Sequence, residues 1–300
     1  MNTLSFGYYP GCSGLGTSME YDASTRSCCA ALGVKLYDIP DWTCCGSTPA
    51  HTVDRVLSTA ISTRNFAQAE KAGLTDITTP CPSCLKNLKN ALHALEDDFF
   101  KARVEALTER PLKENHSVRS VLQVIVEEVG LEAVKKSVVR PLKGLKVVPY
   151  YGCLMNRPGN AMQFDNPENP VAMDNLLTAL GATVLPYPFK VECCGASLGV
   201  ADRTVVPHLS SKLLQAAVDA GADCIVVACP LCQMNLDLRQ EQINRAKGTA
   251  YSIPVPYFTQ LAGYAFGENV AKLGFDKLAL DVLPLLEQCE AQQAEGEAAQ

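Results

Sequence analysis

Two short stretches of the sequence are nearly the same: "CPSCLKNL" at residues 81–88 and "CPLCQMNL" at residues 229–236. Both follow the pattern Cys-Pro-x-Cys-x-x-Asn-Leu, and one lies in each half of the 300-residue chain. A single Cys-x-x-Cys pair is a weak signal, because metal sites and redox motifs of many kinds contain one. The recurrence of the whole pattern indicates an internal duplication.

The repeat extends from these stretches toward the N-terminus of each half. "YYPGC" ends at Cys12 and is followed by "CCG" at 44–46, and "YYGC" ends at Cys153 and is followed by "CCG" at 193–195. The gap before the adjacent cysteines is 31 residues in the first half and 39 in the second, and the next gap is 35 and 34. Ten of the 14 cysteines therefore form two sets of five in the same order. The first set is Cys12, Cys44, Cys45, Cys81 and Cys84, and the second set is Cys153, Cys193, Cys194, Cys229 and Cys232.

The composition is that of an ordinary globular protein, with 47% hydrophobic and 19% charged residues. At roughly 150 residues per domain, the length suggests two domains that each bury a core. The formal net charge of −6 argues against a nucleic-acid partner, which would call for a basic face. The opening "MNTLSFGYYP" does not resemble a secretory signal, and no apolar run approaches the ~20 residues of a membrane span. We therefore expect no transmembrane segment and a cytoplasmic location.

A disulfide framework is not expected in the cytosol, where thiols are kept reduced. Clustered cysteines in that compartment more often bind metal or carry out redox chemistry. Four cysteines have no counterpart in the other half, and we interpret them as packing or surface residues: Cys28, Cys29, Cys224 and Cys289.

Strand-like and helix-like stretches alternate around each cysteine set. The strand-like stretches lead into the cysteine loops, and helical stretches end at Gly33 and Gly181. This alternation predicts an α/β fold of two duplicated Rossmann-like domains, each a mainly parallel sheet flanked by helices. The cysteines would then lie at the carboxyl ends of strands, where open α/β sheets bind ligands. We place the domains at 1–143, including a helical connection over 96–145, and at 144–290, and predict a disordered tail at 291–300.

Five patterned cysteines per half limit the metal chemistry. A Cys-x-x-Cys pair at the start of a helix puts two sulfurs near one centre, and the helix N-terminus favours the thiolate. A structural zinc ion or a cubane cluster takes four protein ligands. A fifth cysteine suggests a larger or irregular iron–sulfur assembly.

The order Cys, Cys-Cys-Gly, Cys-x-x-Cys, present twice over about residues 10–260, resembles the CCG-domain signature of the B subunit of heterodisulfide reductase. The resemblance implies two non-cubane [4Fe-4S] clusters, the first held by the first cysteine set and the second by the second set. It also implies a catalytic disulfide-reducing subunit, in which a disulfide is cleaved between the two clusters by two one-electron steps. The implied partners are a ferredoxin-like C-type subunit and a flavin-containing A-type subunit. The stretch "GCSGLG" at 11–16 does not have the order of a dinucleotide-binding fingerprint, so electrons must come from a partner.

Alternatives remain for the function and for residues near the cysteines. The chain could be an electron-relay subunit of a dehydrogenase complex, or a zinc-stabilised scaffold without a redox role. The substrate could be a mixed disulfide of methanogenic coenzymes, a disulfide or trisulfide on a sulfur-carrier protein, or another small thiol pair. Asn87 and Asn235 recur in register and could hydrogen-bond near a cluster or be helix surface. His51, His208 and Glu192 could deliver protons but are not assigned to the site.

Overall fold

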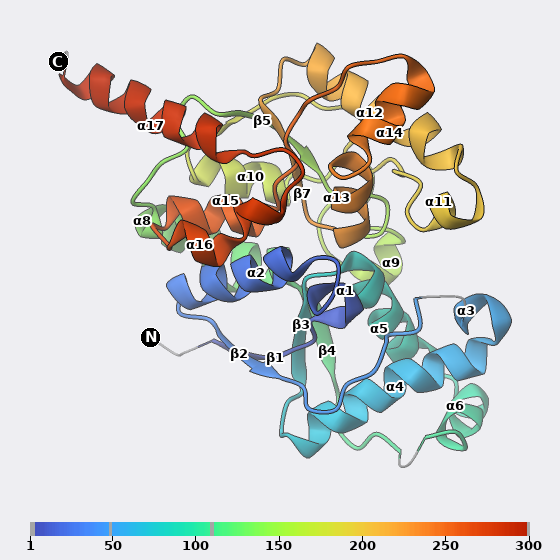
Figure 1. The fold of residues 1–300 in the computed structure, drawn as a ribbon. Coiled ribbons are helices and arrows are strands. Elements are labelled where there is room, and N and C mark those ends of the chain that lie inside the picture. The colour runs from blue at the N-terminus through green and yellow to red at the C-terminus, as the bar shows by residue number, and fades with distance from the viewer. Residues whose placement is uncertain (1–3, 48–49, 109–110, 299–300) are drawn as a thin grey trace.

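Two parallel sheets form the framework of the computed structural model, which describes residues 4–47, 50–108 and 111–298 (Figure 1). The first sheet has the strand order β2-β1-β3-β4 and the second the order β6-β5-β7. Neighbouring strands in both sheets are parallel, which confirms the predicted α/β architecture. The strands are β1 (Ser5–Tyr8), β2 (Lys35–Asp38), β3 (Asp76–Thr79), β4 (Ser117–Ser120), β5 (Lys146–Tyr150), β6 (Thr183–Val184) and β7 (Cys224–Val227).

Helices connect successive strands and cover the sheets. The helices of the first half are α1 (Gly11–Gly14), α2 (Met19–Ala31), α3 (Ala50–Val53), α4 (Arg55–Lys71), α5 (Pro82–Ala94), α6 (Asp98–Glu105), α7 (Val121–Gln123), the π-helical turn η1 (Val124–Gly130) and α8 (Leu131–Ser137). The helices of the second half are α9 (Gly159–Met162), α10 (Ala172–Ala179), α11 (Leu198–Ala201), α12 (Val205–Asp219), α13 (Pro230–Leu236), α14 (Gln240–Lys247), α15 (Phe258–Ala265), α16 (Val270–Leu273), the 3₁₀ turn η2 (Phe275–Lys277) and α17 (Leu283–Ala298).

Local sequence explains where the repeated helices begin and end. Proline stands at the first position of both α5 and α13, where its missing N–H costs nothing, and Cys81 and Cys229 are the N-cap residues. The chain leaves α2 and α10 through Gly33 at φ 73° and Gly181 at φ 97°. These left-handed conformations favour glycine and end the helices as predicted.

A fourth strand lies in the segment 96–145, for which the sequence predicts only a helical connection. β4 pairs in parallel with β3 over four residues, from Asp76↔Ser117 to Thr79↔Ser120. Its sequence, "SVRS", is too short and too polar to be recognised as a strand without its neighbour. Because β4 completes the first sheet, the segment belongs to the fold of the first half rather than to a linker.

The second half fills the same position with an extended segment that is less regular. The Ile225 and Val227 amides donate to the Pro254 and Pro256 carbonyls at 3.0 Å, and Val227 forms a parallel bridge with Tyr257. Prolines can accept but cannot donate a ladder hydrogen bond, so they suit the edge of a sheet. The structural repeat therefore reaches beyond the cysteine motifs in both halves.

Each half places a helix against the other half. α2 packs on α15 and contacts α16 (Figure 1). α10 packs on α8 and α7. Buried residues from both halves form one continuous hydrophobic cluster, rather than the two separate cores suggested by the length. The domain boundary at 143/144 stays a prediction, and the core of the described residues runs across it.

The C-terminal segment is helical where the sequence predicts a disordered tail. α17 continues to Ala298, through most of the segment 291–300 for which the sequence predicts disorder, and extends away from the body of the molecule (Figure 1). Alanine, glutamine and glutamate are strong helix formers, so a low apolar content does not by itself prevent a helix. Residues 299–300 lie outside the described part of the chain.

Candidate cysteine sites

The first cysteine set comes together from three loops at the carboxyl ends of neighbouring strands. Cys12 lies in α1 after β1, Cys44 and Cys45 follow β2, and Cys81 and Cys84 begin α5 after β3. Cys12 is exposed and Cys44 is half-buried, whereas the other three are buried. The Cys45 and Cys84 sulfurs are 3.4 Å apart. The structure thus brings Cys45 and Cys84 into contact and leaves Cys12 on the exposed side, while the full five-cysteine ligand set stays a prediction.

The second set repeats this arrangement around the second sheet. Cys153 follows β5, Cys193 and Cys194 lie in the loop after β6, and Cys229 and Cys232 begin α13 after β7. Cys153 and Cys193 are half-buried, and the other three are buried. The Cys194 and Cys232 sulfurs, which correspond to Cys45 and Cys84, are 3.7 Å apart.

A glycine makes room for a cysteine sulfur in each site. A Cβ atom on Gly11 would lie 2.9 Å from the Cys84 sulfur, and one on Gly152 would lie 2.8 Å from the Cys232 sulfur. Real Cβ atoms do not approach other atoms this closely, and both glycines also have a positive φ, 71° and 70°. Glycine before the first cysteine is therefore required by sulfur packing as well as by backbone conformation.

Serine and asparagine side chains hold the adjacent cysteines of the first site. Ser62 Oγ on α4 donates to the Cys45 carbonyl oxygen at 2.8 Å, and Asn87 Nδ2 on α5 donates to the same oxygen at 3.2 Å. The Asn87 amide nitrogen also lies 4.0 Å from the Cys45 sulfur. Two helices thus fix the backbone that presents Cys45.

The same pair of residues holds the second site. Ser210 Oγ on α12 donates to the Cys194 carbonyl oxygen at 2.9 Å, and Asn235 Nδ2 on α13 lies 3.4 Å from both that oxygen and the Cys194 sulfur. The repeated sequence already identifies both asparagines as residues that could hydrogen-bond near a cluster. Sequence reasoning misses the serines; their only signal is a similar distance from the Cys-Cys-Gly turn, 17 residues in one half and 16 in the other.

Tyrosines support the loops from the strand side. Tyr9 donates its hydroxyl to the Thr43 carbonyl at 2.6 Å, and Tyr150 donates its hydroxyl to the Glu192 carbonyl at 2.7 Å. Each acceptor immediately precedes the adjacent cysteines, and both tyrosines are fully buried. They therefore position the loops and do not line an open cleft.

Contacts between thiols in the first site shift their pKa values in opposite directions. Hydrogen bonds with Cys44 and Cys84 lower the pKa of Cys45 to about 3. A hydrogen bond with Cys84 also lowers the pKa of Cys81, while these contacts, with Cys45 as the stronger, raise the pKa of Cys84. The site can carry thiolate at neutral pH, which is the form that binds metal.

Contacts between thiols also shift the pKa values in the second site, where the lowered values fall less far below that of a free thiol. A hydrogen bond with Cys153 lowers the pKa of Cys193 to about 6, and one with Cys232 lowers the pKa of Cys194 to about 7. The pKa values of Cys153 and Cys232 rise, because of their hydrogen bonds with Cys193 and Cys194 and because of burial, which is partial for Cys153. The Asn235 amide contributes to the lowered pKa of Cys194.

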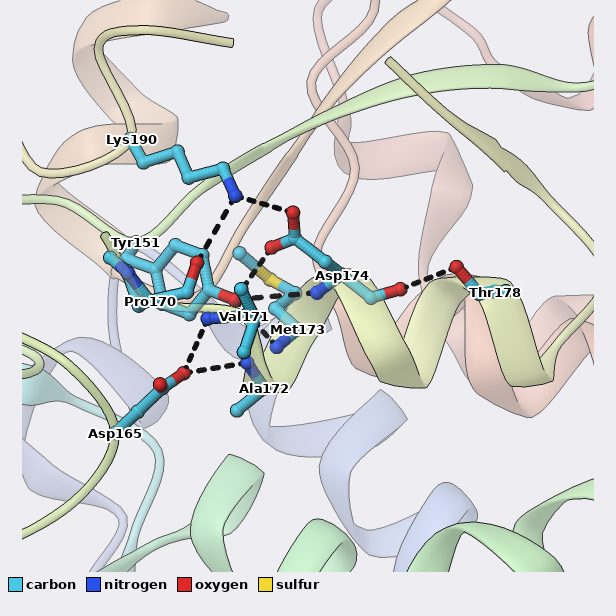
Figure 2. A network of polar contacts seen from close by, with 9 residues as sticks. All are labelled: Tyr151, Asp165, Pro170, Val171, Ala172, Met173, Asp174, Thr178 and Lys190. Carbon is cyan, nitrogen blue, oxygen red and sulfur yellow. Dashed lines mark hydrogen bonds and ion pairs between the residues drawn. The ribbon is translucent and has the colours of Figure 1, made fainter. Parts of the chain in front are cut away.

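A polar network fastens the first loop of the second site to α10 (Figure 2). The Tyr151 hydroxyl donates to Asp174 Oδ2 at 2.8 Å and accepts from the Met173 amide at 2.7 Å. Lys190 forms an ion pair with Asp174, and its carbonyl accepts from the Tyr151 amide at 2.9 Å. Because Lys190 lies just before Cys193, the network joins the loop of Cys153 to the loop of the adjacent cysteines.

The structure also locates most of the cysteines and histidines that the sequence leaves outside the two sets. Cys28, Cys29 and Cys224 are buried in the core, as predicted for packing residues, and Cys289 is half-buried against it. His208 is exposed on α12, and the side chain of His51 lies outside the described residues.

The chemistry of the donor sets fits an iron–sulfur group. Each set offers five thiols, sulfur is the donor that iron–sulfur clusters take, and glycine leaves space beside a buried sulfur in both sites. Within the described residues, no group of three or more His, Cys, Asp or Glu side chains is arranged so that it could hold a metal ion. The described helices also include none that is both long enough and apolar enough to cross a membrane.

Comparisons with known proteins agree with the duplicated arrangement. The CCG cysteine-rich domain family matches residues 6–89 and 147–237, more than half of the chain. The chain is 33% identical to the B subunit of a ferredoxin/F420H2-dependent CoB-CoM heterodisulfide reductase of Methanosarcina acetivorans, over 88% of this chain and 90% of that one. It is 32% identical to the 8-methylmenaquinol:fumarate reductase membrane anchor subunit of Wolinella succinogenes, over 93% of this chain and 98% of that one.

A solved structure supports the fold alone. A hypothetical protein from Helicobacter pylori superposes with a TM-score of 0.73 over 93% of this chain, at 13% identity. The chain spans about half of that protein, 52% of its length.

Proposed function

Because the chain belongs to the CCG cysteine-rich domain family and both of its cysteine sets are complete, we propose that it is the disulfide-reducing subunit of a heterodisulfide reductase-type complex. The observation that carries the proposal is the equivalence of the two sites. Each is built from the same three loops, the same glycine and the same serine–asparagine pair. A protein that needed only one metal centre would not need this frame twice.

The stoichiometry of disulfide reduction would explain why the chain has two cysteine sites. Cleaving a disulfide to two thiols consumes two electrons and two protons. The first cysteine set would hold one non-cubane [4Fe-4S] cluster and the second set another, and a bound cluster supplies one electron at a time. Two sites that face one substrate can therefore match the two sulfur atoms and the two electrons.

The side chains of the protein hold and orient the ligands in this proposal. Ser62 and Asn87 fix the backbone that presents Cys45, and Ser210 and Asn235 fix the one that presents Cys194. The exposed edge at Cys12 leaves one face of the first site open to a partner or substrate. Electrons would come from a ferredoxin-like C-type subunit and a flavin-containing A-type subunit, in the cytoplasm.

The relative from Wolinella favours a second candidate function. Its name assigns it to a fumarate reductase, and compared with the heterodisulfide reductase relative its identity is nearly the same, 32% against 33%, and its coverage of this chain is higher, 93% against 88%. In that case the present chain would be an electron-relay subunit of a dehydrogenase or reductase complex, and no disulfide would bind between the sites.

Anaerobic reconstitution followed by a disulfide-reduction assay tests the proposal. The protein should bind about eight irons per chain if each site holds a four-iron cluster. With a reduced dye as donor, it should then reduce at least one disulfide or trisulfide in a panel of small thiols and sulfur-carrier proteins. Full iron loading without reduction of any of them would favour the relay function, and stoichiometric zinc with negligible iron would contradict both.

A further inference from the structure

Tyr21 connects the first half of the chain to the second cysteine site. It lies on α2 and is 1% exposed, and its hydroxyl donates to the Ala228 carbonyl oxygen at 3.1 Å. Ala228 is fully buried and immediately precedes Cys229, the N-cap residue of α13. A side chain only nine positions after Cys12 in the sequence therefore touches the backbone of the opposite site.

The Tyr21 ring is held by the second half as well. It stacks on Tyr257 with ring centroids 4.0 Å apart and an interplanar angle of 5°, and meets Phe258 edge-on at 6.2 Å. One turn further along α2, the Ser24 and Thr259 hydroxyls are 2.8 Å apart, and both side chains are fully buried. These contacts keep Tyr21 in a single orientation with its hydroxyl directed at Ala228.

The electric environment of Tyr21 includes both cysteine sites. Burial raises the pKa of its phenol well above the usual value, and charge on Cys229 and Cys81 raises it further. The phenol therefore stays protonated and remains a hydrogen-bond donor. Cys229 and Cys81 are the corresponding first cysteines of the two Cys-x-x-Cys pairs, so charge at the same position of each site acts on Tyr21.

We propose that Tyr21 is a positioning residue of the second site, supplied by the first half of the chain. Its hydroxyl fixes the peptide group that precedes Cys229 at the start of α13. Because its ring is held between α2 and the second half, the position of α2 determines where this hydroxyl lies. The inference rests on the proposed function insofar as the cysteine sets hold clusters. Tyr21 would make the geometry of the second site depend on the docking of the two halves.

Tyr21→Phe separates this role from core packing, because phenylalanine keeps the stacked ring and removes only the donor. In the metal-free protein, we expect alkylation of Cys229 to accelerate about fivefold, the effect of losing one buried hydrogen bond, with Cys81 unchanged. Peptide mass spectrometry after timed alkylation measures both rates. In the reconstituted protein, the spectrum and midpoint potential of the second site should shift, measured in a Cys81→Ser background, while the first site stays unchanged in a Cys229→Ser background.

Two control variants lose comparable hydrogen bonds elsewhere. Ser24→Ala removes a buried bond from the same interface between halves without touching Ala228. Tyr187→Phe removes a bond from a buried tyrosine to the Leu213 carbonyl at 3.0 Å, away from the Cys-x-x-Cys pair. Both should leave the alkylation rate of Cys229 within twofold of the wild-type rate. An equal acceleration in Tyr21→Phe and Ser24→Ala would mean that general loosening of the interface is responsible, and the inference would be wrong.

A fluorinated tyrosine at position 21 provides a test that does not depend on the stability of Tyr21→Phe. Difluorotyrosine keeps the ring and the hydroxyl but is a stronger donor, so alkylation of Cys229 should become slower than in the wild-type protein. An unchanged or faster rate would overturn the inference. Failure of the wild-type protein to take up iron would instead contradict the proposed function, and the alkylation results would still test Tyr21.

Discussion

The two cysteine sites have the same frame but are held in place differently. In the second site, the first loop is fastened by Asp174 and Lys190, whose side chains are 17% and 12% exposed. In the first half, Tyr8 donates to Asp22, which pairs with Arg26. Arg26 is 35% exposed and continues outward to Asp38, which is 60% exposed. The second site is thus closed by a mostly buried network and the first by one that opens to solvent.

The difference extends to the cysteines themselves. Cys12 is exposed, whereas its counterpart Cys153 is half-buried and in contact with Cys193. The first site also contains the more strongly lowered thiol pKa, about 3 for Cys45 against about 6 for Cys193 and about 7 for Cys194. The two halves therefore share the positions of the cysteines in the fold, while residues outside the motif leave the first site more accessible than the second.

The largest expected effect comes from removing one site at a time. Cys81→Ser should remove the first site and Cys229→Ser the second, each with a loss of about half of the iron. Each variant should nevertheless lose disulfide reduction almost completely, because neither remaining site can bind both sulfurs or supply both electrons. Iron content and turnover of the two single variants and the double variant measure this.

The double variant is the informative comparison for that prediction. Residues that act as one unit are strongly non-additive, so the double variant should be scarcely worse than either single variant. A folded single variant that has lost one site and still turns over substantially would favour the relay function. Cys28→Ser is a matched control, since this cysteine is buried in the core and outside both sets.

The glycines beside the sulfurs should give the next largest effect. Gly11→Ala and Gly152→Ala each place a Cβ within 2.9 Å of a ligand sulfur, so each should lower the iron content of its own site. Gly33→Ala and Gly221→Ala are matched controls with φ of 73° and 72° and no atom within 4 Å of the added Cβ. The controls should cost only the roughly 1–2 kcal/mol of a left-handed alanine, without loss of iron.

Iron analysis and urea unfolding of the metal-free variants distinguish the two contributions. The two glycine variants can be compared directly, because the added Cβ would lie almost equally close to a ligand sulfur in both sites, 2.9 Å in the first and 2.8 Å in the second. If Gly33→Ala lost as much iron as Gly11→Ala, backbone strain alone would explain the requirement for glycine, and the argument from sulfur packing would fail.

Sequence reasoning reached the repeat, the parallel α/β fold and the placement of the cysteine loops, because cysteine spacing and strand–helix alternation are local signals. It did not reach β4, whose four residues become a strand only through pairing with β3. It also missed Ser62 and Tyr21, which act on residues 17 and 207 positions away. A hydrogen bond of this kind depends on how helices dock, and no periodicity in the chain records it.

The asparagines should give a smaller effect that differs between the sites. A hydrogen bond to a ligand sulfur raises the reduction potential of an iron–sulfur cluster, so its loss lowers the potential. Asn235→Ala should lower the potential of the second site by some tens of millivolts, because its amide is 3.4 Å from the Cys194 sulfur. Asn87→Ala should change the first site less, since the corresponding distance is 4.0 Å.

Spectroscopic redox titration of each site checks this order. Ser62→Ala and Ser210→Ala are the matched controls, because these hydroxyls contact the carbonyls of the same cysteines, at 2.8 and 2.9 Å. Their effects on the two potentials should be small and similar. A larger shift from Asn87→Ala than from Asn235→Ala would contradict the distances as the cause.

The smallest effect is expected at a pair of equivalent positions with opposite charge. Lys89 and Asp237 each lie eight residues after the first cysteine of the Cys-x-x-Cys pair. Lys89 donates to the Met162 carbonyl, and burial lowers its pKa. Asp237 accepts from the Ala279 amide at 2.7 Å, and burial raises its pKa from 3.8 to about 6. The two halves therefore use this position to attach different segments of the second half.

The raised pKa of Asp237 predicts a particular dependence of stability on pH. Below about pH 4 the carboxyl is protonated in both the folded and the unfolded protein. Between about pH 4 and pH 6 the unfolded chain releases this proton while the folded protein keeps it, so the free energy of unfolding should fall as pH rises. Above pH 6 both forms are ionised and this contribution becomes constant. Asp237→Asn should therefore remove a fall in the free energy of unfolding of about 1–2 kcal/mol between pH 4.5 and 7.5, measured by urea unfolding of the metal-free protein.

Asp223→Asn serves as the control, because Asp223 also accepts from a backbone amide, that of Lys146 at 2.8 Å, but is only half-buried. If both variants retained the wild-type slope, the burial of Asp237 would not be the cause, and this position would not distinguish the two halves energetically.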